Sequence, residues 1–272
     1  MSYNYESEKL THLEVEHKSH TLFIYLDNPQ MRNAFTIEMI ESFEKILPKA
    51  DRDPDILAIV IGARGSSFSA GGDIKLMEKK EGMFAGEPFE LMENYRNGIQ
   101  RIPRLFESIN TPTIAMINGA CVGAGCDFTC MMDLRIAGPN AMFKQTFSNL
   151  SLVPGDGGTY FLTRAIGFSR AMEMYLLGDT FKAHEAKEIG LVHKLADSDE
   201  DLVELVEKVA KKIAKKAPKA VRATKNILKR SYHEGLHEQL EMLSLYQGML
   251  QNTPEHIEGL LALKEKRSPK FN

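Results

Sequence analysis

The segment TIAMINGACVGAGCD, residues 113–127, decides the fold class of this chain. Residues 113–117 form a short apolar run, which is typical of a strand buried on both faces. The Asn-Gly pair at residues 118–119 ends that strand, and the glycines at residues 123–125 open a run that predicts a helix over residues 123–132. A strand, a glycine-rich turn and a helix in this order favour a sheet with parallel strands.

The pattern continues on both sides of this segment. Thr36 is placed to cap a helix, and the sequence after residue 163 is almost entirely helical in its periodicity. The composition shifts near residue 197, so we expect an α/β core over residues 1–197 and a helical C-terminal region over residues 198–272. The expected strands cover residues 13–17, 21–26, 56–61 and 134–137, and the expected helices cover residues 36–50, 89–107, 183–188, 201–216, 220–230, 234–250 and 254–266.

Composition excludes several classes of protein. Of the 272 residues, 43% are hydrophobic and 26% are charged, which is a balance typical of folded globular chains rather than disordered ones. The net charge of −3 gives no basic field for nucleic acid, so no nucleic-acid partner is expected. No stretch is long and apolar enough for a membrane span or a signal peptide, and we expect a cytoplasmic location without membrane contact.

The three cysteines lie within ten residues of one another, at positions 121, 126 and 130. An odd and clustered set is not a disulfide framework, and no histidine stands among them to complete a zinc site. We expect buried free thiols and no bound metal.

A second glycine-rich turn, FSAGGDIK at residues 68–75, also follows an expected strand. Small residues let a ligand approach the backbone and expose N–H groups as donors. Ala124 begins the helix after the first turn, so its N–H has no partner within that helix. Two such donors would stabilise the oxyanion of a thioester enolate. The spacing alone fits equally well with two tight turns that serve only the fold.

Further motifs follow in a fixed order along the chain. They are MRNAF at residues 31–35, PGDGGT with LTRAIG at residues 154–167, AHEAKEIGLV at residues 183–192 and LKEKRSPKF at residues 263–271. With the two glycine-rich turns, these motifs resemble the enoyl-CoA hydratase/isomerase (crotonase) superfamily over nearly the whole chain. The resemblance implies an α/β fold with a ββα-superhelix core and a helical C-terminal region that forms a homotrimer or a hexamer and covers the acyl-CoA site.

The resemblance also implies site residues. Gly72 and Ala124 match the two oxyanion donors, and no cofactor is implied because coenzyme A is part of the substrate. The other matches are substrate contacts: Ala70, Asp73 and Ile74 toward the adenine end of coenzyme A, Asn33 and Ala34 along the pantetheine arm, and Lys266 and Lys270 toward its phosphates. Lys266 and Lys270 fit surface lysines without a ligand equally well.

The catalytic acids depart from the hydratase pattern. Asp127 stands where hydratases carry one glutamate, and Phe147, expected in the acyl pocket, stands where they carry the second. Because Phe147 cannot transfer a proton, the usual pair of carboxylates is incomplete. Asp156 lies in a turn where some isomerases and dehalogenases of the superfamily place an essential aspartate. Structural roles also fit both residues: Asp127 at a helix N-terminus and Asp156 within its turn.

We therefore expect an acyl-CoA enzyme that is an enoyl-CoA hydratase or double-bond isomerase, with Asp127, Asp156 or both moving protons. One alternative is another reaction of the superfamily, by a hydrolase, a dehalogenase or a carbon–carbon lyase, with Asp156 as nucleophile or base. A second alternative is a catalytically silent homologue that binds acyl-CoA, or RNA through the lysine-rich helix at residues 208–219.

Overall fold

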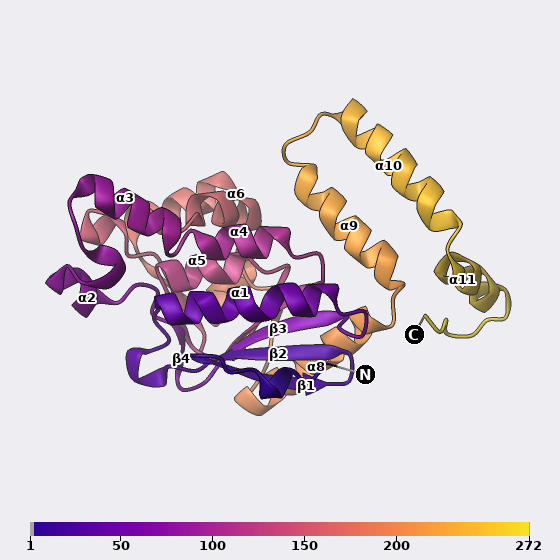
Figure 1. The fold of residues 1–272 in the computed structure, drawn as a ribbon, viewed down its shortest axis with the longest axis horizontal. Helices are drawn as coiled ribbons and strands as arrows, with labels where there is room; N and C mark the ends of the chain where they lie inside the picture. Colours follow the sequence, from indigo (N-terminus) through magenta and orange to yellow (C-terminus); the bar gives the residue numbers. More distant parts are fainter. Residues whose placement is uncertain (1–2, 272) are drawn as a thin grey trace.

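The structure is a computed structural model that describes residues 3–271, and it contains two β-sheets surrounded by helices (Figure 1). The larger sheet has six strands in the order β1-β2-β3-β5-β7-β10, and only the hairpin of β1 and β2 is antiparallel. Its strands are β1 (Leu13–Lys18), β2 (Thr21–Leu26), β3 (Ala58–Ala63), β5 (Thr113–Ile117), β7 (Leu134–Ala137) and β10 (Lys194–Leu195).

The smaller sheet has four short strands in the order β4-β6-β8-β9. They are β4 (Ser67–Ser69), β6 (Ala120–Val122), β8 (Met142–Lys144) and β9 (Thr180–Lys182). Strands β3, β5 and β7 of the larger sheet each lead through a short turn into β4, β6 and β8 of the smaller one, and these three pair in parallel. Helices follow β4 and β6, so the chain repeats a ββα unit, and the predicted α/β fold class is confirmed.

Helices cover both faces of the larger sheet. Helix α1 (Ile37–Arg52) begins at Thr36, whose side-chain oxygen accepts a hydrogen bond from the N–H of Met39 at 3.2 Å. It shares one core cluster with Leu22 and Ile24, whereas Phe23 belongs to a second cluster with helix α8 (Asp199–Ala214). Successive strand residues point to opposite faces, so α1 and α8 lie on opposite sides of the sheet.

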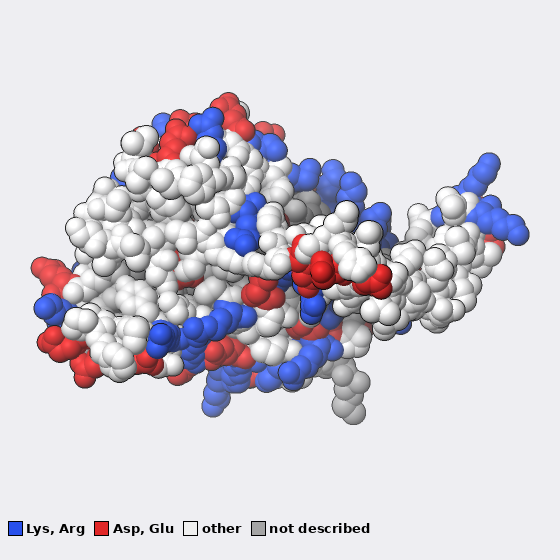
Figure 2. Space-filling view, turned by 90° about the horizontal axis from the view of Figure 1, so that it is seen from above, with Lys and Arg blue, Asp and Glu red and all other residues white. Residues whose placement is uncertain are grey.

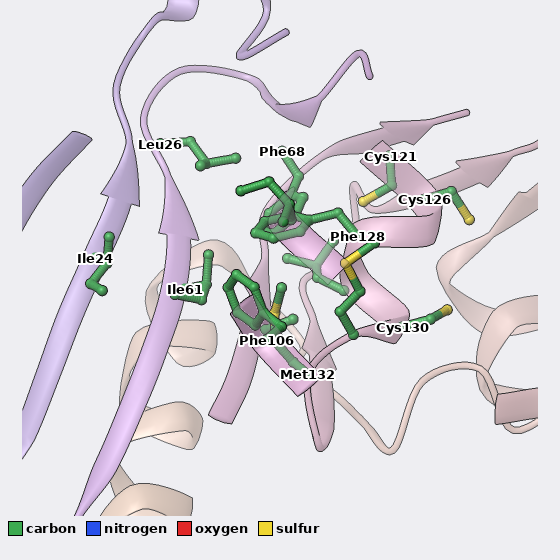
Figure 3. Close-up of a cluster of buried hydrophobic side chains, with 14 of the residues drawn as sticks. Ile24, Leu26, Ile61, Phe68, Phe106, Cys121, Cys126, Phe128, Cys130 and Met132 are labelled. Carbon is green, nitrogen blue, oxygen red and sulfur yellow. The ribbon is translucent and has the colours of Figure 1, made fainter. Parts of the chain in front are cut away.

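The ring of Phe128 lies at the centre of the main core (Figure 3). It packs edge-on against Phe106 and Phe35, with ring centroids 5.1 and 5.2 Å apart. The three cysteines around it, at positions 121, 126 and 130, are buried and free, as the sequence predicted. Phe128 belongs to α5 (Ala124–Cys130), so this packing fixes the helix that carries Ala124 and Asp127.

The prediction of a single helix over residues 89–107 was wrong. The structure has two helices there, α3 (Pro88–Asn97) and α4 (Arg101–Ser108). Gly98 breaks the run with φ −108° and ψ −114°, and a Cβ at this position would stand 2.6 Å from the carbonyl oxygen of Asn94. Before α3 come α2 (Ile74–Lys79) and the short 3-10 helix Gly82–Phe84, and three further 3-10 helices cover Tyr5–Ser7, Pro29–Met31 and Ser148–Leu150.

The late helices are α6 (Gly158–Leu177), α7 (Ala183–Glu188), α8, α9 (Pro218–Arg230), α10 (Leu236–Gln251) and α11 (Pro254–Lys264). The expected division at residue 197 falls just before α8, which packs on the sheet. Helices α9, α10 and α11 form an arm on the side of the molecule away from α2 (Figure 1). Side chains of α9 donate hydrogen bonds to carbonyls of the core, for example Lys225 to Thr111. The C-terminal segment returns toward the start of α9, where Phe271 lies in one pocket with Ala217. Within residues 3–271, no helix is long and apolar enough to cross a membrane.

Candidate active site

The two glycine-rich turns meet at the ends of β4 and β6. Gly71 has φ +79°, and a Cβ there would stand 2.5 Å from the carbonyl oxygen of Val122 and 2.9 Å from the nitrogen of Ala124. Only glycine allows both this conformation and this close approach. The carbonyl of Gly71 also accepts a hydrogen bond from the N–H of Phe35 at 2.8 Å, which ties the first turn to the start of α1.

Neither the N–H of Gly72 nor that of Ala124 has a hydrogen-bond partner in the part of the chain that the structure describes. Ala124 is the first residue of α5, so its N–H lies beyond the reach of the helix's own carbonyls. Both residues are half-buried, so a pair of unpaired N–H donors lining one cavity is available to a ligand. The predicted oxyanion donors are therefore brought together by the two turns.

Both donors line a narrow cavity of about 60 Å³. Its walls come from the two turns, from α2 and α3, and from the segment after β8. The side chain of Met77 lies against Gly72, and Phe84 and Phe147 add aromatic walls. The remaining lining residues are Phe35, Ala70, Gly71, Ile74, Met83, Tyr95, Ile99, Gly123, Thr146, Leu150, Leu152, Gly155 and Asp156.

Asp156 is the only charged residue in that lining. It precedes α6 and is 3% exposed. One of its carboxylate oxygens, Oδ1, accepts a hydrogen bond from the N–H of Gly158 at 3.2 Å, and Oδ2 is buried without a donor among the described residues. The turn role that the sequence allowed for Asp156 is thus present, but the residue also faces the cavity.

Asp127 does not line the cavity. Its side chain is 0% exposed and lies behind Asp156, against the first residue of α6. Oδ1 of Asp127 accepts hydrogen bonds from Nε2 of Gln145 at 2.6 Å and from the hydroxyl of Tyr175 at 2.8 Å. Its Oδ2 is buried, and no donor reaches it among residues 3–271. The two aspartates therefore differ in access, although the sequence could not separate them.

Burial governs the electrostatics of the site. It raises the pKa of Asp127 well above the ordinary value, and the nearby Asp156 carboxyl adds to this effect. Burial also raises the pKa of Asp156, while the hydrogen bond from the Gly158 N–H lowers it in part. The pKa of Tyr95, which lines the same cavity, is raised by burial and then by the charge of Asp156.

The predicted substrate contacts divide into two groups. Ala70, Ile74 and Phe147 line the cavity. Asn33, Ala34 and Asp73 do not, and the side-chain amide of Asn33 donates both its hydrogens to the carbonyls of residues 64 and 67 at 2.9 Å. Asp73 caps α2, since its Oδ1 accepts from the N–H of Lys75 at 2.8 Å. Their contacts with coenzyme A stay predictions, and within this chain they shape the turns.

Lys266 and Lys270 lie apart from the other predicted residues. Both are exposed and follow α11, which lies on the side of the molecule away from α2 and α3 (Figure 1). The N–H of Lys270 donates to Oε1 of Glu258 at 2.7 Å, which fixes the C-terminal segment on α11. The fold therefore holds them far from this chain's own cavity.

Sequence reasoning gave no individual role to three polar residues of the site. Tyr95 enters the cavity from α3, and Tyr175 and Gln145 hold Asp127 from α6 and from the segment after β8. Tyr175 lies 48 residues beyond Asp127, so no local spacing connects the two. Within the described residues, no group of three or more His, Cys, Asp or Glu side chains could hold a metal ion.

Free backbone donors beside one buried carboxylate, in an otherwise apolar cavity, are typical of enzymes that stabilise an oxyanion while a proton moves. The sequence profile of the enoyl-CoA hydratase/isomerase family matches residues 16–272. The chain belongs to this family, the crotonase superfamily, and is one of its enzymes.

Similar proteins cover nearly the whole chain. A probable enoyl-CoA hydratase of Mycobacterium bovis is 33% identical over 263 residues, which cover 94% of this chain and 96% of that protein. The crotonyl-CoA hydratase of Syntrophomonas wolfei is 33% identical, with 95% and 96% covered. The crystal structure of the enoyl-CoA hydratase of Bacillus anthracis superposes with a TM-score of 0.88 at 29% identity, over 96% of this chain and 99% of that one.

Proposed function

We propose that this enzyme shifts the carbon–carbon double bond of an enoyl-CoA thioester, with Asp156 as the group that carries the proton. The observation behind this proposal is that, among residues 3–271, Asp156 is the only charged residue lining the cavity that contains the unpaired N–H groups of Gly72 and Ala124. A shift of a double bond needs one base that removes a proton and returns it elsewhere, so a single carboxylate suffices.

The proposed reaction has two proton transfers. The thioester oxygen accepts hydrogen bonds from Gly72 and Ala124, and the Asp156 carboxylate removes a proton from the α-carbon of a β,γ-enoyl group. The electrons of that C–H bond move onto the thioester oxygen, where the two N–H groups stabilise the enolate. Protonated Asp156 then delivers the proton to the γ-carbon, the carbonyl re-forms, and the double bond lies between the α- and β-carbons.

No further reactant is needed, because only a proton moves and coenzyme A belongs to the substrate. The apolar side chains of Ile74, Met77 and Phe147 support an acyl group without charge as the occupant of the cavity. Free buried thiols fit the expectation of a reducing compartment, and the cytoplasmic location stays a prediction.

The test is turnover of enoyl-CoA thioesters in D2O by the wild-type enzyme and by Asp156→Asn. We expect the wild type to convert a β,γ-enoyl thioester to its α,β isomer, with deuterium at the γ-carbon where the proton on Asp156 exchanges with solvent before its return. We expect a loss of about 10²–10⁴-fold in kcat with the variant. Substrate binding should change little, because an amide has nearly the shape of a carboxyl group. Full turnover by Asp156→Asn would overturn the proposal.

Hydration is the second candidate, and the names of the relatives favour it. Here Asp156 would take a proton from water as the oxygen attacks the β-carbon, and would give one to the α-carbon. The two reactions separate in H2¹⁸O, since only hydration places ¹⁸O on the β-carbon. The shortage of carboxylates in the cavity is the reason for placing the double-bond shift first.

We also propose that copies of the chain associate through the arm. Apolar side chains on α10 and α11 are exposed in the single chain, including Leu245 at 69% and Leu263 at 77%. Seen from above, the arm is mostly white, the colour of residues other than Lys, Arg, Asp and Glu (Figure 2). Such a surface supports burial against another copy, as in the expected trimer or hexamer. Association would also bring Lys266 and Lys270 of one copy near the cavity of another copy.

A further inference from the structure

Two buried carboxyl groups face each other beside the cavity. Oδ2 of Asp127 and Oδ2 of Asp156 are both buried, and neither receives a hydrogen bond from an N–H or O–H of the described residues. Gly158 joins the two groups, because it lies directly against the Asp127 carboxyl and its N–H donates to Oδ1 of Asp156. The pKa of each carboxyl group is shifted by the other, which agrees with a direct contact between them. Two bare carboxylate oxygens would repel at this separation, so the contact requires a shared proton.

The hydrogen bonds around Asp127 show which oxygen carries that proton. Oδ1 of Asp127 already accepts from the Gln145 amide and the Tyr175 hydroxyl, and both of these groups donate. The carbonyl oxygen of a carboxylic acid accepts, whereas its hydroxyl oxygen donates. Because Oδ1 takes two donors, we assign the proton to Oδ2, which lies against Gly158 beside Asp156.

The surroundings of Asp156 favour the ionised carboxylate more than the surroundings of Asp127 do. Its Oδ1 accepts from the N–H of Gly158, and the residue lies at the N-terminal end of α6, where the helix dipole stabilises negative charge. Asp156 also borders the cavity, whereas Asp127 is enclosed in the core. A negative charge therefore costs less on Asp156 than on Asp127.

We propose that Asp127 is a positioning residue that stays protonated and donates its Oδ2–H to Oδ2 of Asp156. This inference rests on the proposed function, in which Asp156 is the base. The hydrogen bond holds the Asp156 carboxylate toward the cavity and leaves its other lone pairs free for the substrate proton. Asp127 thus acts through Asp156 and never touches the substrate, although it occupies the position of a hydratase glutamate.

The pKa directions agree with this geometry. Burial, and then the charge of Asp156, raises the pKa of Asp127 well above its usual range. Burial also raises the pKa of Asp156, and the hydrogen bonds from the Gly158 N–H and from Asp127 lower it in part. The other titratable groups that face the pair have pKa values raised by burial and stay neutral near pH 7. They are Tyr95 from α3, Tyr175 from α6, and Cys126 and Cys130 from α5.

The experiment compares Asp127→Asn, Asp127→Leu and Asp156→Asn through the pH dependence of kcat. In Asp127→Asn the new side-chain amide still donates to Asp156, so most of the turnover and the acid limb of the profile should be kept. In Asp127→Leu the new side chain cannot donate, so the acid limb should move to higher pH by on the order of one pH unit. Asp156→Asn should lose turnover as stated above.

Each outcome has a separate meaning. A loss of about 10²–10⁴-fold in Asp127→Asn, as large as that in Asp156→Asn, would make Asp127 a catalytic acid and overturn this inference while leaving Asp156 as the base. An unmoved acid limb in Asp127→Leu would also overturn it. Full turnover by Asp156→Asn would instead refute the proposed function.

A second measurement does not depend on whether Asp127→Leu folds. The infrared spectrum of the folded wild type at neutral pH should contain the carbonyl stretch of a buried protonated carboxylic acid. The difference between the spectra of the wild type and each variant shows whether the band belongs to Asp127. The band should be missing in Asp127→Asn and present in the control Asp179→Asn, which removes an exposed carboxylate. Its absence from the wild type would contradict a protonated Asp127.

Discussion

Gly158 lies directly against the carboxyl group of Asp127, so closely that a Cβ at position 158 would overlap with it. This contact brings the first turn of α6, and with it Asp156, onto the carboxyl group of Asp127 in α5. A glycine that looks like part of a helix start in the sequence is thus a spacer between the two aspartates.

The Gly158→Ala variant tests this contact. The added methyl group must displace either α6 or the Asp127 side chain, so we expect the free energy of unfolding to fall by about 1–3 kcal/mol. Turnover should fall as well, because Asp156 moves with α6. Chemical denaturation and steady-state kinetics measure the two effects.

The control is Gly248→Ala in α10, where no atom lies within 4 Å of the new Cβ and helix propensity predicts a gain of about 1 kcal/mol in the free energy of unfolding. Equal stability of Gly158→Ala and wild type would refute the spacer role.

The Ala124→Pro variant removes the backbone N–H of residue 124, one of the two proposed oxyanion donors, and leaves all the other side chains of the site in place. Proline is tolerated at the first position of a helix, which Ala124 occupies, so the melting temperature should change little. Loss of the N–H should lower kcat by about 10²–10³-fold. The matched control is Ala124→Gly, which keeps the N–H and should keep turnover. A proline variant as active as the glycine variant would exclude Ala124 as an oxyanion donor.

The Asp127→Asn variant should be more stable than the wild type at pH 7, and the gain should shrink toward pH 4. The pKa of Asp127 is raised in the folded state, so the folded chain binds this proton more tightly than the unfolded chain. Stability from this group is therefore greatest below the unfolded pKa and falls as the pH rises toward the folded pKa.

Asparagine does not ionise, so the variant does not lose stability in this way as the pH rises. At pH 7 its free energy of unfolding should exceed that of the wild type by about 1 kcal/mol or more, since one pKa unit corresponds to about 1.4 kcal/mol. Urea titrations of both proteins between pH 4 and pH 7 measure it. Asp179→Asn, at an exposed position, should show no comparable trend. A difference between Asp127→Asn and wild type that is constant with pH would contradict a protonated Asp127.

The Leu245→Arg variant tests association through the arm. Leu245 is exposed on α10 in the single chain, and burial of a charge at a contact between copies would be costly. We expect a smaller particle in size-exclusion chromatography with light scattering, with helix content unchanged by circular dichroism. Gln247→Arg is the control, because residues two apart on a helix point to nearly opposite sides. A wild-type protein that is monomeric at every concentration measured would refute the proposal.

Local sequence was enough to predict much of the fold. The strand at residues 113–117, the Thr36 cap and the glycine-rich turns follow from short-range rules of burial, capping and backbone freedom. The helix break at Gly98 was missed because the apolar periodicity continues across it, and only the carbonyl of Asn94 closing on that glycine excludes a side chain. The apolar residues that are exposed on α10 and α11 stand in the sequence at positions that periodicity alone could not divide into a core face and a free one.

By itself the sequence, through its resemblance to the family, predicted the two donors at Gly72 and Ala124, a phenylalanine at position 147 in place of a hydratase carboxylate, and two candidate acids. The tertiary structure decided which candidate meets the cavity. Asp156 borders it, whereas Asp127 is enclosed behind Asp156 by Gln145, Tyr175 and Gly158. The physical reason is that the ionisation of a carboxyl group depends on its solvent access and its hydrogen-bond partners. At Asp127 those partners come from segments distant in sequence, so folding alone sets its state.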